Sequence, residues 1–121
     1  MDFTISPEME ALRLKVRDFI TEQVIPLEAD PASYNEFENI KMSLLDEVRA
    51  KAKAAGLWAP QMPKSRGGLE LPVAGWAVFY EEAARSIFGP SALNCQAPDD
   101  GNMSVLNKVL ATEALKDKWL Q

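Results

Sequence analysis

Histidine is absent from the 121 residues of the sequence, and cysteine occurs once, at Cys95. Without histidine, the chain cannot itself assemble Ser-His-Asp or Cys-His nucleophilic machinery. A single thiol cannot form an internal disulfide or supply the ligands of a Cys/His zinc site, and it fits a reducing compartment. These absences exclude the usual hydrolases and the zinc-dependent folds.

Long apolar runs and clustered positive charge are also missing. No stretch approaches the roughly 20 apolar residues that span a bilayer, and the start, Met1-Asp2-Phe3-Thr4, lacks the basic and apolar regions of a signal peptide. A formal net charge of -5 argues against nucleic acid and anionic membrane as partners. We expect a cytoplasmic protein whose residues 1–121 form one domain.

Helical periodicity dominates the chain and predicts an all-α fold, a bundle of about five helices. Ser6-Pro7-Glu8 is typical of a helix start, and the helix should end before Pro26. A second helix is expected over about 35–55, with Phe37 on its apolar face and Gly56 as its C-terminal stop. The first helix carries one apolar stripe, made of Met9, Leu12, Val16, Phe19, Ile20 and Val24.

The second half of the chain predicts a helix over 72–87, a short piece through 91–94, a long helix after Gly101 and a last helix capped by Thr112. The helix after Gly101 is apolar most of the way round, which indicates a central, buried position. The stripe expected on the 72–87 helix comprises Val73, Trp76, Ala77, Tyr80, Ala83, Ala84 and Ile87.

Few residues could carry chemistry. Glu81 and Glu82 could act as an acid/base pair, but adjacent helix positions do not face each other, which favours a solvated face or a structural ion pair. Cys95 has no basic neighbour and is expected to be a small buried hydrophobe rather than a reactive thiol. Asp99 and Asp100 do not match a calcium loop and are expected to cap the next helix.

The stretch Leu93-Asn94-Cys95-Gln96-Ala97-Pro98-Asp99-Asp100-Gly101-Asn102-Met103 lies between two predicted helices and forms a corner that could hold a ligand at a fixed depth. With Leu57-Trp58-Ala59-Pro60, Pro63-Lys64-Ser65-Arg66-Gly67-Gly68-Leu69, Glu81-Glu82-Ala83-Ala84-Arg85-Ser86 and residues 116–120, it resembles the N-terminal helical domain of acyl-CoA dehydrogenases, in the branch that handles longer acyl chains. The resemblance covers nearly the whole chain.

The resemblance implies α,β-desaturation of an acyl-CoA thioester, with FAD accepting hydride. In that family a flavin-binding β-domain and a C-terminal helical domain follow, and the base and main flavin contacts lie there or between subunits. This chain would supply pocket wall and interdomain surface, without retaining FAD or turning over substrate alone. The acyl chain would meet Leu93, Gln96, Ala97 and Asp100, with Met103 behind them.

Two features depart from the family pattern. Gln96 and Asp100 are polar where a plain fatty tail would meet carbon, so Asp100 either bonds to the protein or meets a polar substrate tail. Leu110-Ala111 stands where the family usually has a glycine. Gly67-Gly68 is read as a tight turn, or by resemblance as an element near the flavin and acyl chain.

A second hypothesis remains open, a stand-alone helical binding or assembly module that reuses the fold without catalysis. In either case, a domain that normally packs on others would expose apolar side chains such as Val105, Val109 and Trp119. Large apolar patches mark interfaces, so a homo-oligomer is expected.

Overall fold

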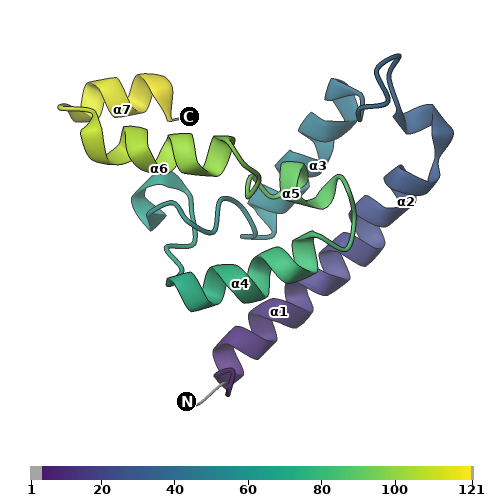
Figure 1. Cartoon of the computed structure of the whole chain (residues 1–121), viewed down its shortest axis with the longest axis horizontal. Coiled ribbons are helices and arrows are strands. Elements are labelled where there is room, and N and C mark those ends of the chain that lie inside the picture. The colour runs from purple at the N-terminus through teal and green to yellow at the C-terminus, as the bar shows by residue number, and fades with distance from the viewer. Residues whose placement is uncertain (1–3, 121) are drawn as a thin grey trace.

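The computed structural model describes residues 4–120, and all of their regular structure is helical (Figure 1). Apart from one isolated bridge between Tyr34 and Ile40, no β pairing occurs in this range. The all-α prediction is confirmed. The elements in chain order are α1 (Pro7–Phe19), η1 (Ile20–Val24), α2 (Ile25–Ala29), η2 (Pro31–Ser33), α3 (Met42–Ala54), η3 (Lys64–Arg66), α4 (Val73–Ala83), α5 (Gly89–Ala92), α6 (Asp99–Val109) and α7 (Glu113–Trp119).

The first helix begins as predicted and ends later than predicted. The Ser6 hydroxyl accepts a hydrogen bond from the Met9 amide at 3.3 Å, which caps α1. At Ile20 the backbone widens into the π-helical turn η1, and the Ile25 amide donates to the Ile20 carbonyl. Because Pro26 then lies in the first turn of α2, where an amide proton has no helical partner to lose, the chain stays helical past it.

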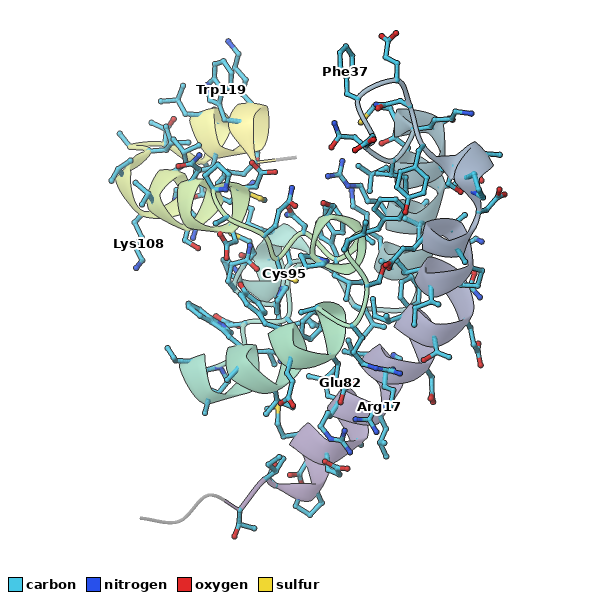
Figure 2. The ribbon with its side chains drawn as sticks, turned by 45° about the vertical axis from the view of Figure 1, so that its right-hand side comes forward. Arg17, Phe37, Glu82, Cys95, Lys108 and Trp119 are labelled. Atoms are coloured by element: carbon cyan, nitrogen blue, oxygen red, sulfur yellow. The ribbon has the colours of Figure 1, made fainter. Side chains whose placement is uncertain are left out.

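The second predicted helix starts later than expected, at Met42. The Asn35 side chain accepts hydrogen bonds from the amides of Phe37 and Asn39, which holds residues 35–39 in a turn. The Phe37 side chain is 73% exposed, so its predicted place on a buried helix face is wrong (Figure 2). Gly56, with φ of 67°, ends the helix as predicted.

Residues 57–71 form an irregular segment packed into the domain. Leu57, Ala59 and Met62 are buried. Gly67 takes φ of 76° after η3, which confirms the tight turn. The backbone at Gly68 runs so close to the segment before it that an added Cβ would lie 2.2 Å from the Met62 carbonyl oxygen, so only glycine fits.

Helix α4 packs against α1, but of the stripe predicted for it only Ala83 is buried. Val73 and Ile87 are 72% and 67% exposed, whereas Phe79 and Glu82 are buried. Gly75 allows the close approach, since a Cβ there would meet the Met9 side chain at 3.1 Å. The helix is apolar nearly all round, so periodicity alone could not select its buried face.

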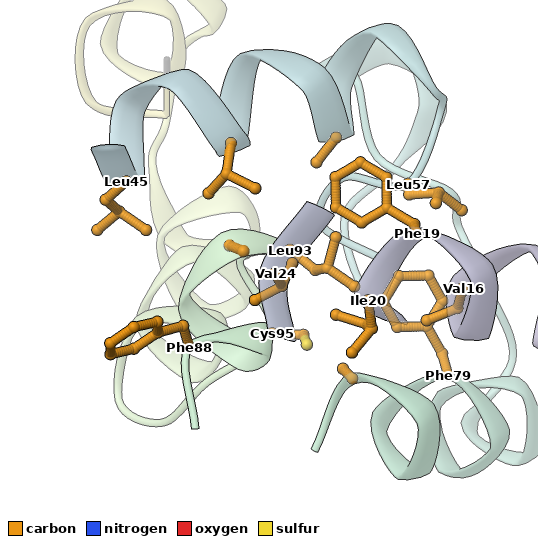
Figure 3. Close-up of a cluster of buried hydrophobic side chains, with 14 of the residues drawn as sticks. Val16, Phe19, Ile20, Val24, Leu45, Leu57, Phe79, Phe88, Leu93 and Cys95 are labelled. Atoms are coloured by element: carbon orange, nitrogen blue, oxygen red, sulfur yellow. The ribbon is translucent and has the colours of Figure 1, made fainter. Parts of the chain in front are cut away.

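The main core lies where α1 and η1 meet α3, α4 and α5 (Figure 3). The predicted stripe of the first helix supplies Val16, Phe19, Ile20 and Val24, all buried. Phe79 from α4 and Leu93 from the end of α5 close the other side. Burial of this kind stabilises the fold by about 25 cal/mol per Å² of apolar surface removed from water. The segment between α5 and α6 begins from this core at Leu93.

Helices α6 and α7 lie side by side at one end of the molecule (Figure 1). No side chain of α6 is buried, so the predicted central position is wrong within the described residues; Val105 and Val109 are 56% and 66% exposed. Thr112 caps α7 as predicted. Of the helices described, none is both long and apolar enough to cross a membrane.

Candidate functional site

The corner between α5 and α6 begins with buried residues and continues with residues that are half-buried or exposed. Leu93 and Cys95 are buried in the core, and the Cys95 amide donates to the Pro90 carbonyl at 2.9 Å. Asn94 between them adopts φ of 54°, a left-handed conformation that asparagine tolerates better than most residues. Ala97 is exposed on the far side of the turn. The backbone therefore presents residues 96–103 outward from a fixed base.

Gln96 and Asp100, the two polar residues of the predicted acyl wall, are both half-buried and both hydrogen-bonded. The Ser91 hydroxyl donates to the side-chain Oε1 of Gln96 at 2.6 Å. The Tyr80 hydroxyl of α4 donates to Asp100 Oδ2 at 3.0 Å, and the Gly101 amide donates to Oδ1 at 2.7 Å. Asp100 thus meets the requirement that a half-buried carboxylate find partners.

Capping of α6 differs in detail from the prediction. The residue before the helix is Pro98, and its side chain makes no capping hydrogen bond. Asp99 and Asp100 instead occupy the first turn, where their negative charge complements the helix dipole. The predicted capping role of Asp99 and Asp100 is therefore wrong, because both residues lie inside the helix and not at its N-cap position.

Two hollows border the corner, and two of the five predicted site residues line them, whereas Leu93, Ala97 and Asp100 line neither. The first, about 280 Å³, lies between α3 and α6. Its lining comprises Arg49, Trp58, Asn94, Asp99, Asn102, Met103 and Leu106. The second, about 530 Å³, lies between the 35–42 segment and α5 and includes Gln96. Met103 and Gln96 therefore line different hollows, and Leu93 is buried in the core.

Sequence reasoning missed Arg49 and Asn94, which give the first hollow its polarity. Arg49 Nε donates to the Ser91 carbonyl at 3.2 Å, and its guanidinium lies 5.9 Å from the centre of the Trp58 ring. Asn94 is only 6% exposed, and its amide nitrogen donates to the sulfur of Met103 at 3.0 Å. No short-range pattern could have found this site, because Arg49 and Asn94 come from separate elements.

Cys95 behaves as predicted, as a buried small side chain. Burial and the nearby negative charge of Asp100 raise the pKa of the Cys95 thiol to about 12. Burial and the hydrogen bond to Asp100 likewise raise the pKa of the Tyr80 hydroxyl well above its usual value. Neither group ionises near neutral pH, so neither is a nucleophile or base at this corner.

Glu82 belongs to a structural ion cluster, one of the two roles expected for it. Its carboxylate accepts from Arg13 Nη1 at 2.7 Å and from Arg17 Nη2 at 2.6 Å. The hydrogen bond from Arg17 is the main cause that lowers the pKa of Glu82, against the opposing effect of burial. Figure 2 shows Glu82 directed toward Arg17 on α1, on a different side from the corner. The cluster joins α1 to α4 and takes no part in the corner.

The described residues give no sign of a metal centre, since no three of their Cys, Asp or Glu side chains gather closely enough to hold an ion. Nor do the two hollows fit FAD. The larger one is lined by Glu38 and by no lysine or arginine, so it offers nothing to pair with a pyrophosphate. The smaller one, at about 280 Å³, is below the usual size of a cofactor pocket.

Comparison with known proteins gives consistent matches over nearly the whole chain. Residues 6–121 match the family model described as acyl-CoA dehydrogenase, N-terminal domain. The chain is 34% identical to chicken acyl-CoA dehydrogenase family member 11, over 98% of its own length and 16% of that protein's. It is also 34% identical to a Mycobacterium tuberculosis protein named "Probable acyl-CoA dehydrogenase FadE2", over 100% of the chain and 30% of that protein.

One solved structure has a similar fold and sequence. It is described as "a putative acyl-CoA dehydrogenase from Mycobacterium abscessus" and superposes with a TM-score of 0.78 at 33% identity. The match covers 98% of this chain and 31% of that one. The chain thus spans less than a third of the length of each of these three proteins.

Proposed function

The chain belongs to the acyl-CoA dehydrogenase family, and we propose that it acts as the N-terminal helical domain of a FAD-dependent enzyme that desaturates an acyl-CoA thioester between its α and β carbons. Its contribution is pocket wall and interdomain surface. The match of residues 6–121 to the family's N-terminal domain carries the proposal. Because that match leaves most of each relative uncovered, the catalytic base and the flavin contacts are assigned to polypeptide outside this chain.

The proposed wall is the corner between α5 and α6. Leu93 fixes its depth in the core, Gln96, Ala97 and Asp100 present its surface, and Met103 stands behind them on α6. Hydrogen bonds from Ser91 and Tyr80 hold the two polar side chains in place. A wall with fixed dipoles positions a substrate tail without having to reorganise when it binds. FAD supplies the redox chemistry when bound, and this chain supplies position.

The isolated chain tests the assignment of roles. It should elute from gel filtration without flavin absorbance and should not reduce a dye acceptor when octanoyl-CoA is added. A polypeptide that continues the reading frame through the later domains should retain flavin and should reduce the dye. Flavin retained by residues 1–121 alone, or dye reduction by them, would contradict the proposed division of labour.

A second function, a non-catalytic helical assembly module, is favoured by one observation. Val105, Val109 and Trp119 on α6 and α7 are all more than half exposed (Figure 2 for Trp119), and exposed apolar groups of this size mark interfaces. The reading frame after Gln121 separates the two functions. A few hundred further codons with a flavin-binding domain support the enzyme, and an immediate stop supports the module.

A further inference from the structure

The hollow between α3 and α6 has an unusual lining for a gap between helices. Its apolar part is formed by Met103 and Leu106 of α6 together with Trp58. The rest is polar and includes Arg49 and Asn94. Ligand sites typically combine an apolar surface with a few polar groups that fix orientation.

Arg49 has spare hydrogen-bonding capacity in this hollow. Its Nε donates to the Ser91 carbonyl, and neither of its two terminal nitrogens makes a hydrogen bond or ion pair with any of residues 4–120. The side chain is half-buried, so its charge is less screened than that of a surface arginine. Lys53 Nζ, 4.5 Å from the centre of the Trp58 ring, adds a second positive charge nearby.

Asn94 is the second, independent sign of a ligand. The residue is only 6% exposed, yet its amide nitrogen donates only to a thioether sulfur, which is a weak acceptor. Its Oδ1 atom is not among the fully enclosed polar atoms that lack a partner, so it places no demand on a ligand. An asparagine amide nitrogen carries two protons, so the Asn94 amide can donate one to the Met103 sulfur and the other to an acceptor in the hollow.

We propose that this hollow binds a carboxylate carried on a short apolar body, with the carboxylate at Arg49 and Asn94 and the apolar body against Trp58, Met103 and Leu106. A planar guanidinium matches a carboxylate in two parallel hydrogen bonds, and the asparagine amide can donate a third. The volume, about 280 Å³, suits a small ligand or the end of a larger one.

One residue opposes the ligand. Asp99 also lines the hollow, from the exposed first turn of α6, and its charge repels an anion. Binding affinity should therefore change in opposite directions when the two charges are removed. Removing the positive charge of Arg49 should weaken binding, and removing the negative charge of Asp99 should strengthen it.

The first experiment needs no turnover and therefore stands apart from the proposed desaturation. Hexanoate is titrated into the ¹⁵N-labelled chain of residues 1–121, with 1-hexanol as the neutral probe of equal length. The indole resonance of Trp58, assigned through Trp58→Phe, should shift saturably with hexanoate and much less with the alcohol. The resonances of Trp76 and Trp119, which do not line the hollow, should stay in place.

Matched variants decide the role of charge. Arg49→Met keeps the aliphatic stem and should weaken hexanoate binding roughly tenfold, the loss expected for a charge-assisted pair. Asp99→Asn should tighten it severalfold. Lys108→Met makes the same change of charge on the exposed surface of α6, outside the lining, and should leave affinity unchanged. Equal binding of acid and alcohol, or affinity unmoved by Arg49→Met while the fold is intact, would overturn the inference.

Two sources of carboxylate share this chemistry, the far end of an acyl chain and a free carboxylic acid. Only the first rests on the proposed function. In the complete enzyme, thioesters that end in a carboxylate and thioesters of equal length that end in a methyl group are compared as substrates. A loss of kcat/KM on Arg49→Met that is confined to the carboxylate series assigns the distal end; hexanoate binding without that loss assigns a free acid.

Discussion

Arg17 on α1 donates two parallel hydrogen bonds to Glu82 on α4, from Nε to Oε2 at 2.9 Å and from Nη2 to Oε1 at 2.6 Å. Arg13, one helical turn earlier, donates to the same Oε1 at 2.7 Å. Glu82 is 2% exposed, so the carboxylate is satisfied almost wholly by these two side chains. The pairing holds the first helix of the chain against α4, the helix that also carries Tyr80.

Replacing Glu82 should destabilise the fold. In Glu82→Gln, both arginines lose a charged acceptor in a partly buried place, and we expect the free energy of unfolding to fall by about 2 kcal/mol, since both arginines stay partly in water. Urea denaturation followed by circular dichroism measures the change. Glu81→Gln is the matched control, because Glu81 is exposed, and it should change stability by less than about 0.5 kcal/mol.

The same cluster predicts how stability depends on pH. The hydrogen bond from Arg17 lowers the pKa of Glu82 in the folded state below the ordinary 4.5 of an unfolded chain. Stability from this group is therefore fully present above that ordinary pKa and is lost as the pH falls toward the depressed folded value. Unfolding free energies at pH 7, 5, 4 and 3 should decline below pH 5, less steeply in Glu82→Gln. An identical decline in the variant would remove Glu82 as the cause.

Cys95 should be unreactive in the folded protein. Its thiol is buried, and its pKa is raised to about 12, so thiolate is scarce at pH 8. We expect a disulfide reagent to modify it at least about a hundredfold more slowly in buffer than in urea, where the thiol is free. Rapid labelling of the folded chain at pH 8 would mean that the core around Cys95 opens far more often than its packing suggests.

Tyr80 and Asp100 should be energetically coupled. A double-mutant cycle of Tyr80→Phe and Asp100→Asn should give about 1 kcal/mol, the size of a partly exposed hydrogen bond to a charged acceptor. Tyr34 offers a control, since its hydroxyl donates to the Glu28 carbonyl at 2.8 Å and shares no partner with Asp100. The cycle of Tyr34→Phe with Asp100→Asn should show no coupling. Coupling of equal size in both cycles would point to a general loss of packing.

Arg66 should hold α7 against the irregular segment. Its guanidinium bonds to Glu113 and Asp117 of α7, while Leu120 just after the helix packs on Ala59 and Met62. Arg66→Met should raise the hydrogen-exchange rates of the α7 amides and leave those of α1 unchanged. Lys64→Met in the same turn, where Lys64 is exposed, serves as the control. Unaltered exchange in α7 would mean that the apolar contacts hold it without the ion pairs.

Local sequence signals predicted the parts of this fold that local interactions decide. The Ser6 and Thr112 caps, the Gly56 stop and the stripe from Val16 to Val24 are all present, because each depends on residues within one or two turns. The resemblance to acyl-CoA dehydrogenases then gave the family, which the comparisons confirm.

The sequence predictions were wrong where contacts with an element distant in the sequence decide which residues are buried. Helix α4 is apolar nearly all round, and its buried face was set by Arg13 and Arg17 capturing Glu82 and by Gly75 admitting α1. The sequence of α6 suggested burial, yet nothing in residues 4–120 covers Val105 or Val109. Pro26 did not end the first helix because a π-helical turn preceded it. The role of the acyl-wall residues stays a prediction, because a pocket wall is defined by its contacts with a substrate and with other domains, and a local sequence pattern does not encode these contacts.

The corner between α5 and α6 is proposed to form one wall of an acyl pocket. The direct measurement is photocrosslinking of the complete enzyme with an acyl-CoA that carries a diazirine near the end of its chain. Residues 86–108 form a single tryptic peptide, since Arg85 and Lys108 flank it and no lysine or arginine lies between them. We predict that the label lies in this peptide, at Gln96, Asp100 or Met103. Label found only elsewhere, in an enzyme that oxidises the same thioester normally, would contradict the account.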